Sequence, residues 1–206
     1  MAPQVDLALL TADGNAHEGI KAILGRTQAL AIREIAFSSL VHPEHDPGCL
    51  GRSHDLLRPY VNLARYALVV FDREGSGDDR PAPELEAEVE QHLQANGWAE
   101  RSAAIVIEPE FDAWVWSPSP HVDTILGWKD RSPGLRSWLM QQGFLEAEAG
   151  KPARPKEAME HALREVKKPR SSARYREIGK LVSLTNCTDR AFVKLRTTLQ
   201  TWFASS

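Results

Sequence analysis

A length of 206 residues and a formal net charge of −3 suit one globular domain, or one domain with a helical extension. With 42% hydrophobic and 26% charged residues, the composition is ordinary for a soluble protein. No apolar run reaches the roughly 18 residues of a membrane span, and the N-terminus lacks the features of a signal peptide. Cys49 and Cys187 lie far apart without metal-binding spacing, which fits a reducing compartment. We therefore expect a cytoplasmic protein that does not enter the membrane.

Strands and helices alternate through the first 117 residues. Apolar runs predict strands at residues 5–11, 31–37, 66–71 and 103–107, and apolar spacing predicts helices at 16–30, 52–64 and 84–93. Two prolines and a glycine predict an irregular loop at residues 42–48, and a further helix is expected to begin within residues 110–117. This alternation predicts an α/β fold with a four-stranded, mainly parallel sheet flanked by helices.

The predicted alternation of strands and helices ends at Pro118-Ser-Pro120. The remaining segments predict helices near residues 120–127, 133–142, 155–166, 173–183 and 188–203, with no evident strand. We therefore expect an α/β core at residues 1–117 and a C-terminal helical appendage at 118–206 that packs on the core.

Charge is distributed unevenly between the two ends of the chain. Residues 1–150 carry 12 basic and 23 acidic side chains, whereas residues 151–206 carry 13 basic and 5 acidic ones. The candidate nucleic-acid contacts in this basic region are Lys167, Lys168, Arg170, Arg174 and Arg176. Such side chains either position the phosphates of a nucleic acid or dock in cis on the acidic body of the protein.

Acidic side chains follow three of the predicted strands. Asp13 follows the first, Asp72 and Glu74 follow the strand at 66–71, and Glu108, Glu110 and Asp112 follow the strand at 103–107. The carboxyl ends of parallel strands share one edge of a sheet, so these groups are expected to meet. Clustered carboxylates suit Mg²⁺ or Mn²⁺, whereas Asp13 taken alone equally suits a helix cap or a turn.

The order of these motifs resembles the Toprim fold of topoisomerases, primases and overcoming-lysogenization-defect nucleases. In that family an acid after the first strand acts as general acid/base, and an acid pair after a later strand binds Mg²⁺. The resemblance places Asp13 in the first role and Asp72 and Glu74 in the second. Aspartate at 13 and glutamate at 74 depart from the family pattern, which has glutamate in the first role and Asp-x-Asp in the second.

Three segments resemble more closely a small Toprim-related family of methylation-associated bacterial anti-phage defence systems. They are Asp46-Pro-Gly48, Phe71-Asp-Arg-Glu-Gly-Ser-Gly77 and Pro109-Glu-Phe-Asp-Ala-Trp-Val-Trp-Ser-Pro-Ser-Pro-His121. The resemblance implies a defence component with other defence proteins as partners, and Mg²⁺- or Mn²⁺-dependent cleavage of nucleic acid. The alternative is a catalytically inactive scaffold or ligand-sensing subunit of a defence complex.

Overall fold

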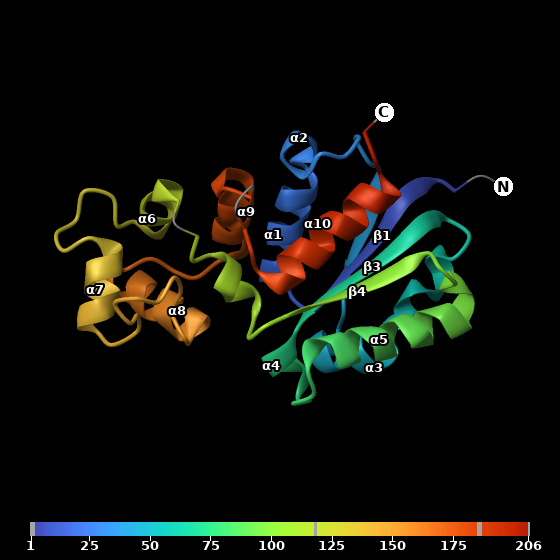
Figure 1. Cartoon of the computed structure of the whole chain (residues 1–206), viewed down its shortest axis with the longest axis horizontal. Helices are drawn as coiled ribbons and strands as arrows, with labels where there is room; N and C mark the ends of the chain where they lie inside the picture. The colour runs from blue at the N-terminus through green and yellow to red at the C-terminus, as the bar shows by residue number, and fades with distance from the viewer. Residues whose placement is uncertain (1–2, 118, 185–186, 206) are drawn as a thin grey trace.

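Four parallel strands form one sheet in the computed structural model, which describes residues 3–117, 119–184 and 187–205. The strands are β1 (Val5–Thr11), β2 (Phe37–Val41), β3 (Ala64–Asp72) and β4 (Ser102–Ile107). Their order across the sheet is β2-β1-β3-β4, and every neighbouring pair is parallel (Figure 1). The predicted α/β fold with a four-stranded sheet flanked by helices is confirmed.

Helices cover both faces of the sheet. The helices α1 (Gly14–Leu24) and α10 (Arg190–Trp202) lie on one face, and α3 (His45–Leu57) and α5 (Ala82–Leu93) lie on the other (Figure 1). Because successive side chains of a strand point to opposite faces, Leu9 joins the core that includes α1, whereas Leu10 joins the core that includes α3. This two-sided burial explains why the strands have apolar runs without alternation.

The chain reverses its direction across the sheet next to β1. From β1 it passes to β2 on one side, and from β2 it returns to β3 on the other side of β1. In the parallel register of β1 and β3, Thr11 pairs with Val70 near the ends of both strands. The loops after β1 and β3 therefore leave the same edge of the sheet. Open parallel sheets bind ligands at such a reversal, in the crevice beyond the carboxyl ends of the strands.

Side chains close the outer edge of β4. Glu90 Oε1 accepts a hydrogen bond from Ala104 N at 3.0 Å, and Glu86 Oε1 accepts one from Val106 N at 2.9 Å. The Arg190 guanidinium donates to Val106 O at 2.8 Å and pairs with Glu86. An open edge strand is a template for unwanted pairing, and α5 and α10 prevent that here.

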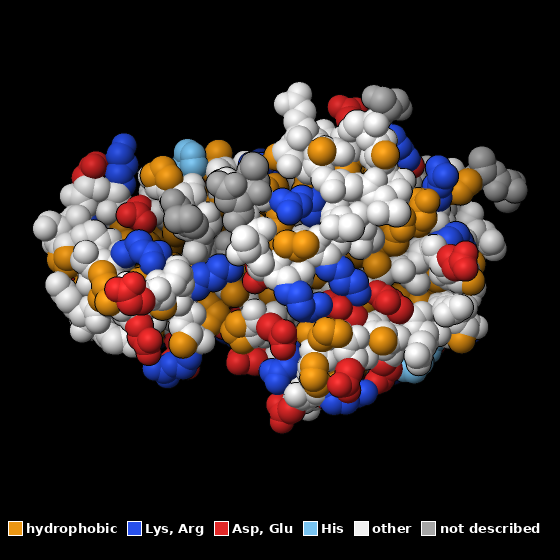
Figure 2. All heavy atoms as spheres, in the orientation of Figure 1, with side chains coloured by type: hydrophobic (Ala, Val, Ile, Leu, Met, Phe, Trp, Pro, Cys, Tyr) orange, Lys and Arg blue, Asp and Glu red, His pale blue; other side chains and the backbone are white. Residues whose placement is uncertain are grey.

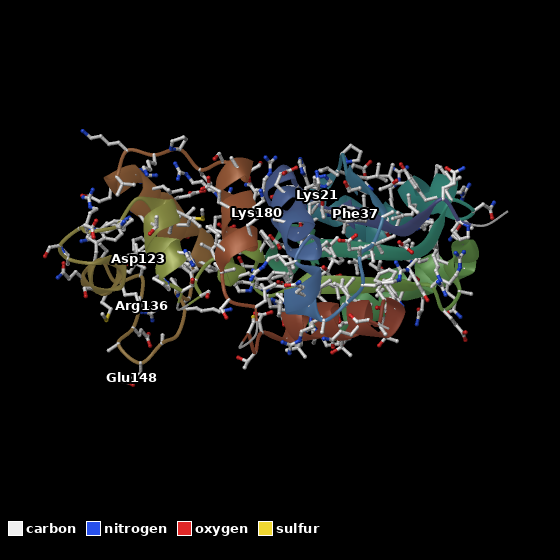
Figure 3. The ribbon with its side chains drawn as sticks, turned by 90° about the horizontal axis from the view of Figure 1, so that it is seen from above. Lys21, Phe37, Asp123, Arg136, Glu148 and Lys180 are labelled. Carbon is white, nitrogen blue, oxygen red and sulfur yellow. The ribbon has the colours of Figure 1, made fainter. Side chains whose placement is uncertain are left out.

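The C-terminal part forms a helical body beside the sheet and then returns to it. It contains α6 (Pro120–Leu126), α7 (Leu135–Gln141), α8 (Pro155–Glu165) and α9 (Ser172–Leu181) before α10. In Figure 3, α9 lies alongside α1, with Lys180 near Lys21. A Cβ on Gly179 would lie 2.7 Å from Gly19 O, so only glycine allows this approach of the two helices. Pro118, at the predicted boundary, lies outside the described residues.

Short helical segments complete the connections between these elements. They are α2 (Thr27–Leu30), η1 (Arg58–Tyr60), α4 (Arg73–Ser76), η2 (Gln94–Trp98) and η3 (Phe111–Trp114). None of the described helices is both long and apolar enough to cross a bilayer.

Two predictions of secondary structure were wrong. The strand expected at 31–37 begins only at Phe37, because Ala31 ends α2 in a left-handed conformation and Ile32 instead pairs with Ala204. The loop expected at 42–48 contains the start of α3 at His45. Pro47 does not prevent this, since the first turn of a helix needs no N–H donors.

Three predicted helices differ in extent. The helix expected at 16–30 is divided at Gly25 into α1 and α2. The one expected at 52–64 begins and ends earlier, and β3 already starts at Ala64. The one expected within 110–117 amounts to the single turn η3.

Candidate functional site at the carboxyl edge of the sheet

Three aspartates gather where β1, β2 and β3 end. Asp13 is the N-cap of α1, Asp46 lies in the first turn of α3, and Asp72 is the last residue of β3. Their charges affect one another, since Asp13 raises the pKa of Asp46 and both raise the pKa of Asp72. The reversal of the sheet therefore carries a set of interacting carboxylates.

Backbone N–H groups fix one oxygen of each of these carboxylates. Asp13 Oδ1 accepts from Asn15 N at 2.7 Å and from Ala16 N at 2.8 Å. Asp46 Oδ1 accepts from Asp72 N at 2.8 Å. Asp72 Oδ1 in turn accepts from the backbone N–H of residue 111 at 2.8 Å. Among the described residues no hydrogen bond reaches Oδ2 of any of the three, which leaves these oxygens for another partner.

Gly75 packs closely against the Asp46 side chain. A Cβ at Gly75 would lie only 2.4 Å from Asp46 Oδ2, closer than real Cβ atoms approach. The loop after β3 therefore packs directly on the first turn of α3, and a side chain at position 75 would displace the Asp46 carboxylate.

Burial and like charge both disfavour the ionised carboxylates. Burial is the main cause that raises the pKa of Asp72 well above its usual range, followed by the charges of Asp46 and Asp13. Burial is also the first cause of the raised pKa of Asp46. Such a cluster is relieved either by protonation or by a cation, and carboxylate oxygens are the ligands that Mg²⁺ prefers.

The other predicted metal ligands have different surroundings. Glu74 is exposed, and Glu108 forms an ion pair with Arg73 at 3.3 Å. Glu110 accepts a hydrogen bond from Lys156 N at 2.9 Å and so caps the start of α8, and burial raises the pKa of its carboxyl group. The structure thus brings Asp13 and Asp72 together with Asp46, and engages Glu108 and Glu110 elsewhere.

Asp112 is held by the C-terminal segment. The Tyr175 hydroxyl donates to Asp112 Oδ1 at 2.5 Å, and the Arg170 guanidinium donates to Oδ2 at 2.8 Å. Arg170 Nε also donates to the Tyr175 hydroxyl at 2.6 Å. Both oxygens of this buried carboxylate therefore have partners, although its charge still contributes to the raised pKa of Asp72.

Most of the predicted nucleic-acid contacts bind within the chain. Besides Arg170, Arg174 donates to Ile125 O at 2.7 Å and Arg176 pairs with Glu18 at 2.5 Å. Lys168 contacts Gly127 at the end of α6, and both Lys167 and Lys168 are exposed. Between α10 and α5, basic and acidic side chains adjoin on the face drawn in Figure 2. For Arg170, Arg174 and Arg176 the structure favours docking in cis.

Two tryptophans of the loop after β4 belong to the core. Trp114 and Trp116 are buried, and their indole N–H groups donate to Asp189 and to Pro155 O at 3.0 Å each. They connect the carboxyl edge to α10 and α8, and neither ring is available to stack on a base.

Sequence reasoning missed Asp46 as a site residue. The segment Asp46-Pro-Gly48 was noted, but the two prolines and the glycine of residues 42–48 pointed to an irregular loop. The available signal was position, because Asp46 follows β2 just as Asp13 and Asp72 follow or end their strands.

No family model, curated protein or solved structure significantly matches this chain. Among the residues that the structure describes, no three His, Cys, Asp or Glu side chains lie close enough to hold one ion by themselves.

Proposed function

We propose that Asp46 and Asp72 hold a hydrated Mg²⁺ or Mn²⁺ ion with Asp13 beside it, and that the protein cleaves phosphodiester bonds of nucleic acid within a bacterial anti-phage defence system. The observation that carries the proposal is the meeting of three interacting carboxylates at the reversal of a parallel sheet. The Toprim-like order of the motifs around Asp13 and Asp72 supports the same chemistry.

The aspartate oxygens suit Mg²⁺ or Mn²⁺, which keep several water ligands, better than a metal whose ligands all come from the protein. Mg²⁺ keeps several waters and is typically held by one or two carboxylates together with substrate phosphates. The Oδ2 atoms of Asp46 and Asp72, which accept no hydrogen bond from a described residue, would supply such a pair, with water completing the shell.

Each aspartate has a distinct role in this proposal. When bound, the metal neutralises charge on the phosphoryl oxygens and orients an attacking water. Asp46 and Asp72 bind through Oδ2 while their Oδ1 atoms stay fixed by backbone N–H groups. Asp13 keeps its Oδ1 on the start of α1 and moves a proton at Oδ2. These anchors set the positions that acid/base chemistry requires.

The test is cleavage of DNA and RNA with Mg²⁺ or Mn²⁺ by the wild type and by Asp46→Asn and Asp72→Asn. Loss of one metal ligand is expected to reduce the rate by roughly a hundredfold or more. Glu84→Gln is a matched control, because Glu84 is an exposed acid in the first turn of α5. Equal activity of all variants would contradict the proposed site.

A second candidate is a non-catalytic scaffold or ligand-sensing subunit of a defence complex. It is favoured by the use of Arg170, Arg174 and Arg176 in cis, which leaves few of the expected phosphate contacts free. This function predicts no cleavage with any metal and a stable complex with another protein of the defence system. Size-exclusion chromatography with candidate partners, beside the cleavage assay, separates the two functions.

A further inference from the structure

Two histidines meet between α3 and α5, on the sheet face opposite α1. His54 lies on α3, after a break in the helix at Arg52, and His92 lies in the last turn of α5. Their ring centroids are 5.5 Å apart and their planes differ by 63°. The two side chains are 38 positions apart in the sequence, so only the packing of the helices brings them together.

Both rings carry a buried nitrogen without a partner. Nδ1 of His54 and Nδ1 of His92 are inaccessible to solvent and make no hydrogen bond with any described residue. Buried polar atoms in folded proteins nearly always have a partner. These two atoms lie on adjacent rings, so a single ligand between the rings would engage both.

The separation of the rings matches a pair of imidazoles on one metal ion. With metal–nitrogen bonds of about 2.0–2.1 Å, each ring centre lies about 3.2 Å from the ion, and a tetrahedral angle places the two centres about 5.2 Å apart. The observed 5.5 Å is close to this value. Imidazole nitrogens suit Zn²⁺, Ni²⁺ and Cu²⁺, whereas Mg²⁺ prefers oxygen.

A carboxylate lies beside the other ring nitrogen of His54. Asp55 Oδ1 is 3.7 Å from His54 Nε2, the nitrogen that the proposed metal would leave free. A carboxylate beside the distal nitrogen of a ligand histidine is a frequent arrangement in metal sites.

We propose that His54 and His92 bind one Zn²⁺-class transition-metal ion through their Nδ1 atoms and thereby join α3 to α5. No third His, Cys, Asp or Glu among the described residues completes the set, so water would have to enter beside the two rings to fill the remaining positions. The site is separate from the proposed Mg²⁺ site in both residues and ligand chemistry.

Thermal unfolding with micromolar Zn²⁺ or Ni²⁺ tests the proposal. A ligand that binds only the folded protein raises the melting temperature, and this rise is expected for the wild type but not for His54→Gln or His92→Gln. Each variant is expected to bind Zn²⁺ roughly tenfold or more weakly. His121→Gln, at an exposed position on α6, is the matched control and should keep the full response.

Chemical modification provides a second measurement on the unaltered chain. Zn²⁺ is expected to protect His54 and His92, but not His121, from diethyl pyrocarbonate. The proposal is overturned if Zn²⁺ and Ni²⁺ leave the wild-type melting temperature unchanged, or if both glutamine variants respond as the wild type does. Asp72→Asn should retain the Zn²⁺ response, so failure of the Mg²⁺ site and failure of this site are distinguishable.

Discussion

The backbone N–H of Asp72 donates a 2.8 Å hydrogen bond to Oδ1 of Asp46. This bond ties the end of β3 to the first turn of α3, and Gly75 closes the space behind Asp46. Two carboxylates that are held in this way cannot separate to relieve their repulsion. The carboxyl edge is therefore arranged to bind a proton or a cation, at a cost in stability.

Asp72→Asn is expected to stabilise the protein at neutral pH. Burial and the charges of Asp46 and Asp13 hold the pKa of Asp72 above its unfolded value of about 3.9, so the folded protein binds this proton more tightly. Wild-type stability therefore falls as the pH rises from the unfolded pKa to the folded pKa, and asparagine removes this loss. Urea unfolding should show a gain at pH 7 that disappears near pH 4. A less stable variant at pH 7 would contradict the electrostatic interpretation.

Gly75→Ala is expected to destabilise the protein by about 1–3 kcal/mol, because the new methyl group meets the Asp46 carboxylate. It should also weaken binding of Mn²⁺. Gly51→Ala is the matched control, since nothing lies within 4 Å of its added Cβ and alanine favours the helix. Urea unfolding and Mn²⁺ titration measure both effects. Equal stability of the two variants would show that the loop after β3 does not fix Asp46.

Tyr175→Phe is expected to cost about 1–3 kcal/mol of unfolding free energy. The substitution removes a hydroxyl that donates to buried Asp112 and accepts from Arg170, and so leaves two polar atoms without that partner. Tyr60→Phe should change stability little, because no described residue bonds to the Tyr60 hydroxyl. Urea unfolding compares the two variants, and similar losses from both would argue against the buried network.

Glu86→Gln is expected to destabilise the fold more than Glu88→Gln. Glu86 is buried and pairs with Arg190 and Lys194, whereas Glu88 forms a surface pair with Arg80. Because Arg190 and Lys194 are partly exposed, about 1–3 kcal/mol is expected for Glu86 and under about 1 kcal/mol for Glu88. Denaturant unfolding of both variants measures the difference, and the reverse ranking would refute the role of Glu86 at the edge of β4.

The sequence predicted the strands that are buried on both faces better than β2, which is only partly buried. β1, β3 and β4 have apolar runs, whereas β2 contains Ser38 and Ser39 and is only partly buried, so its signal was weaker than that of the apolar residues before it. An apolar run in the sequence predicts a strand well when the strand is buried on both faces, because burial then requires an apolar residue at every position.

The candidate site could be predicted only in part for a different reason. Asp13 and Asp72 were found because the carboxyl ends of parallel strands must share an edge. The partners of Glu110 and Asp112 depend on how α8 and α9 dock, and those contacts join residues more than 45 positions apart. No local pattern encodes such choices, so acids that follow a strand were assigned to a metal although the chain itself engages them.

Crystals soaked in Mn²⁺ and measured at the manganese absorption edge provide the most direct measurement of the proposed site. We expect one anomalous peak beside Oδ2 of Asp46 and Asp72, within reach of Asp13 directly or through water. No peak at this edge of the sheet, or a peak only at Glu74 or Glu110, would contradict the proposal that Asp46 and Asp72 hold the ion.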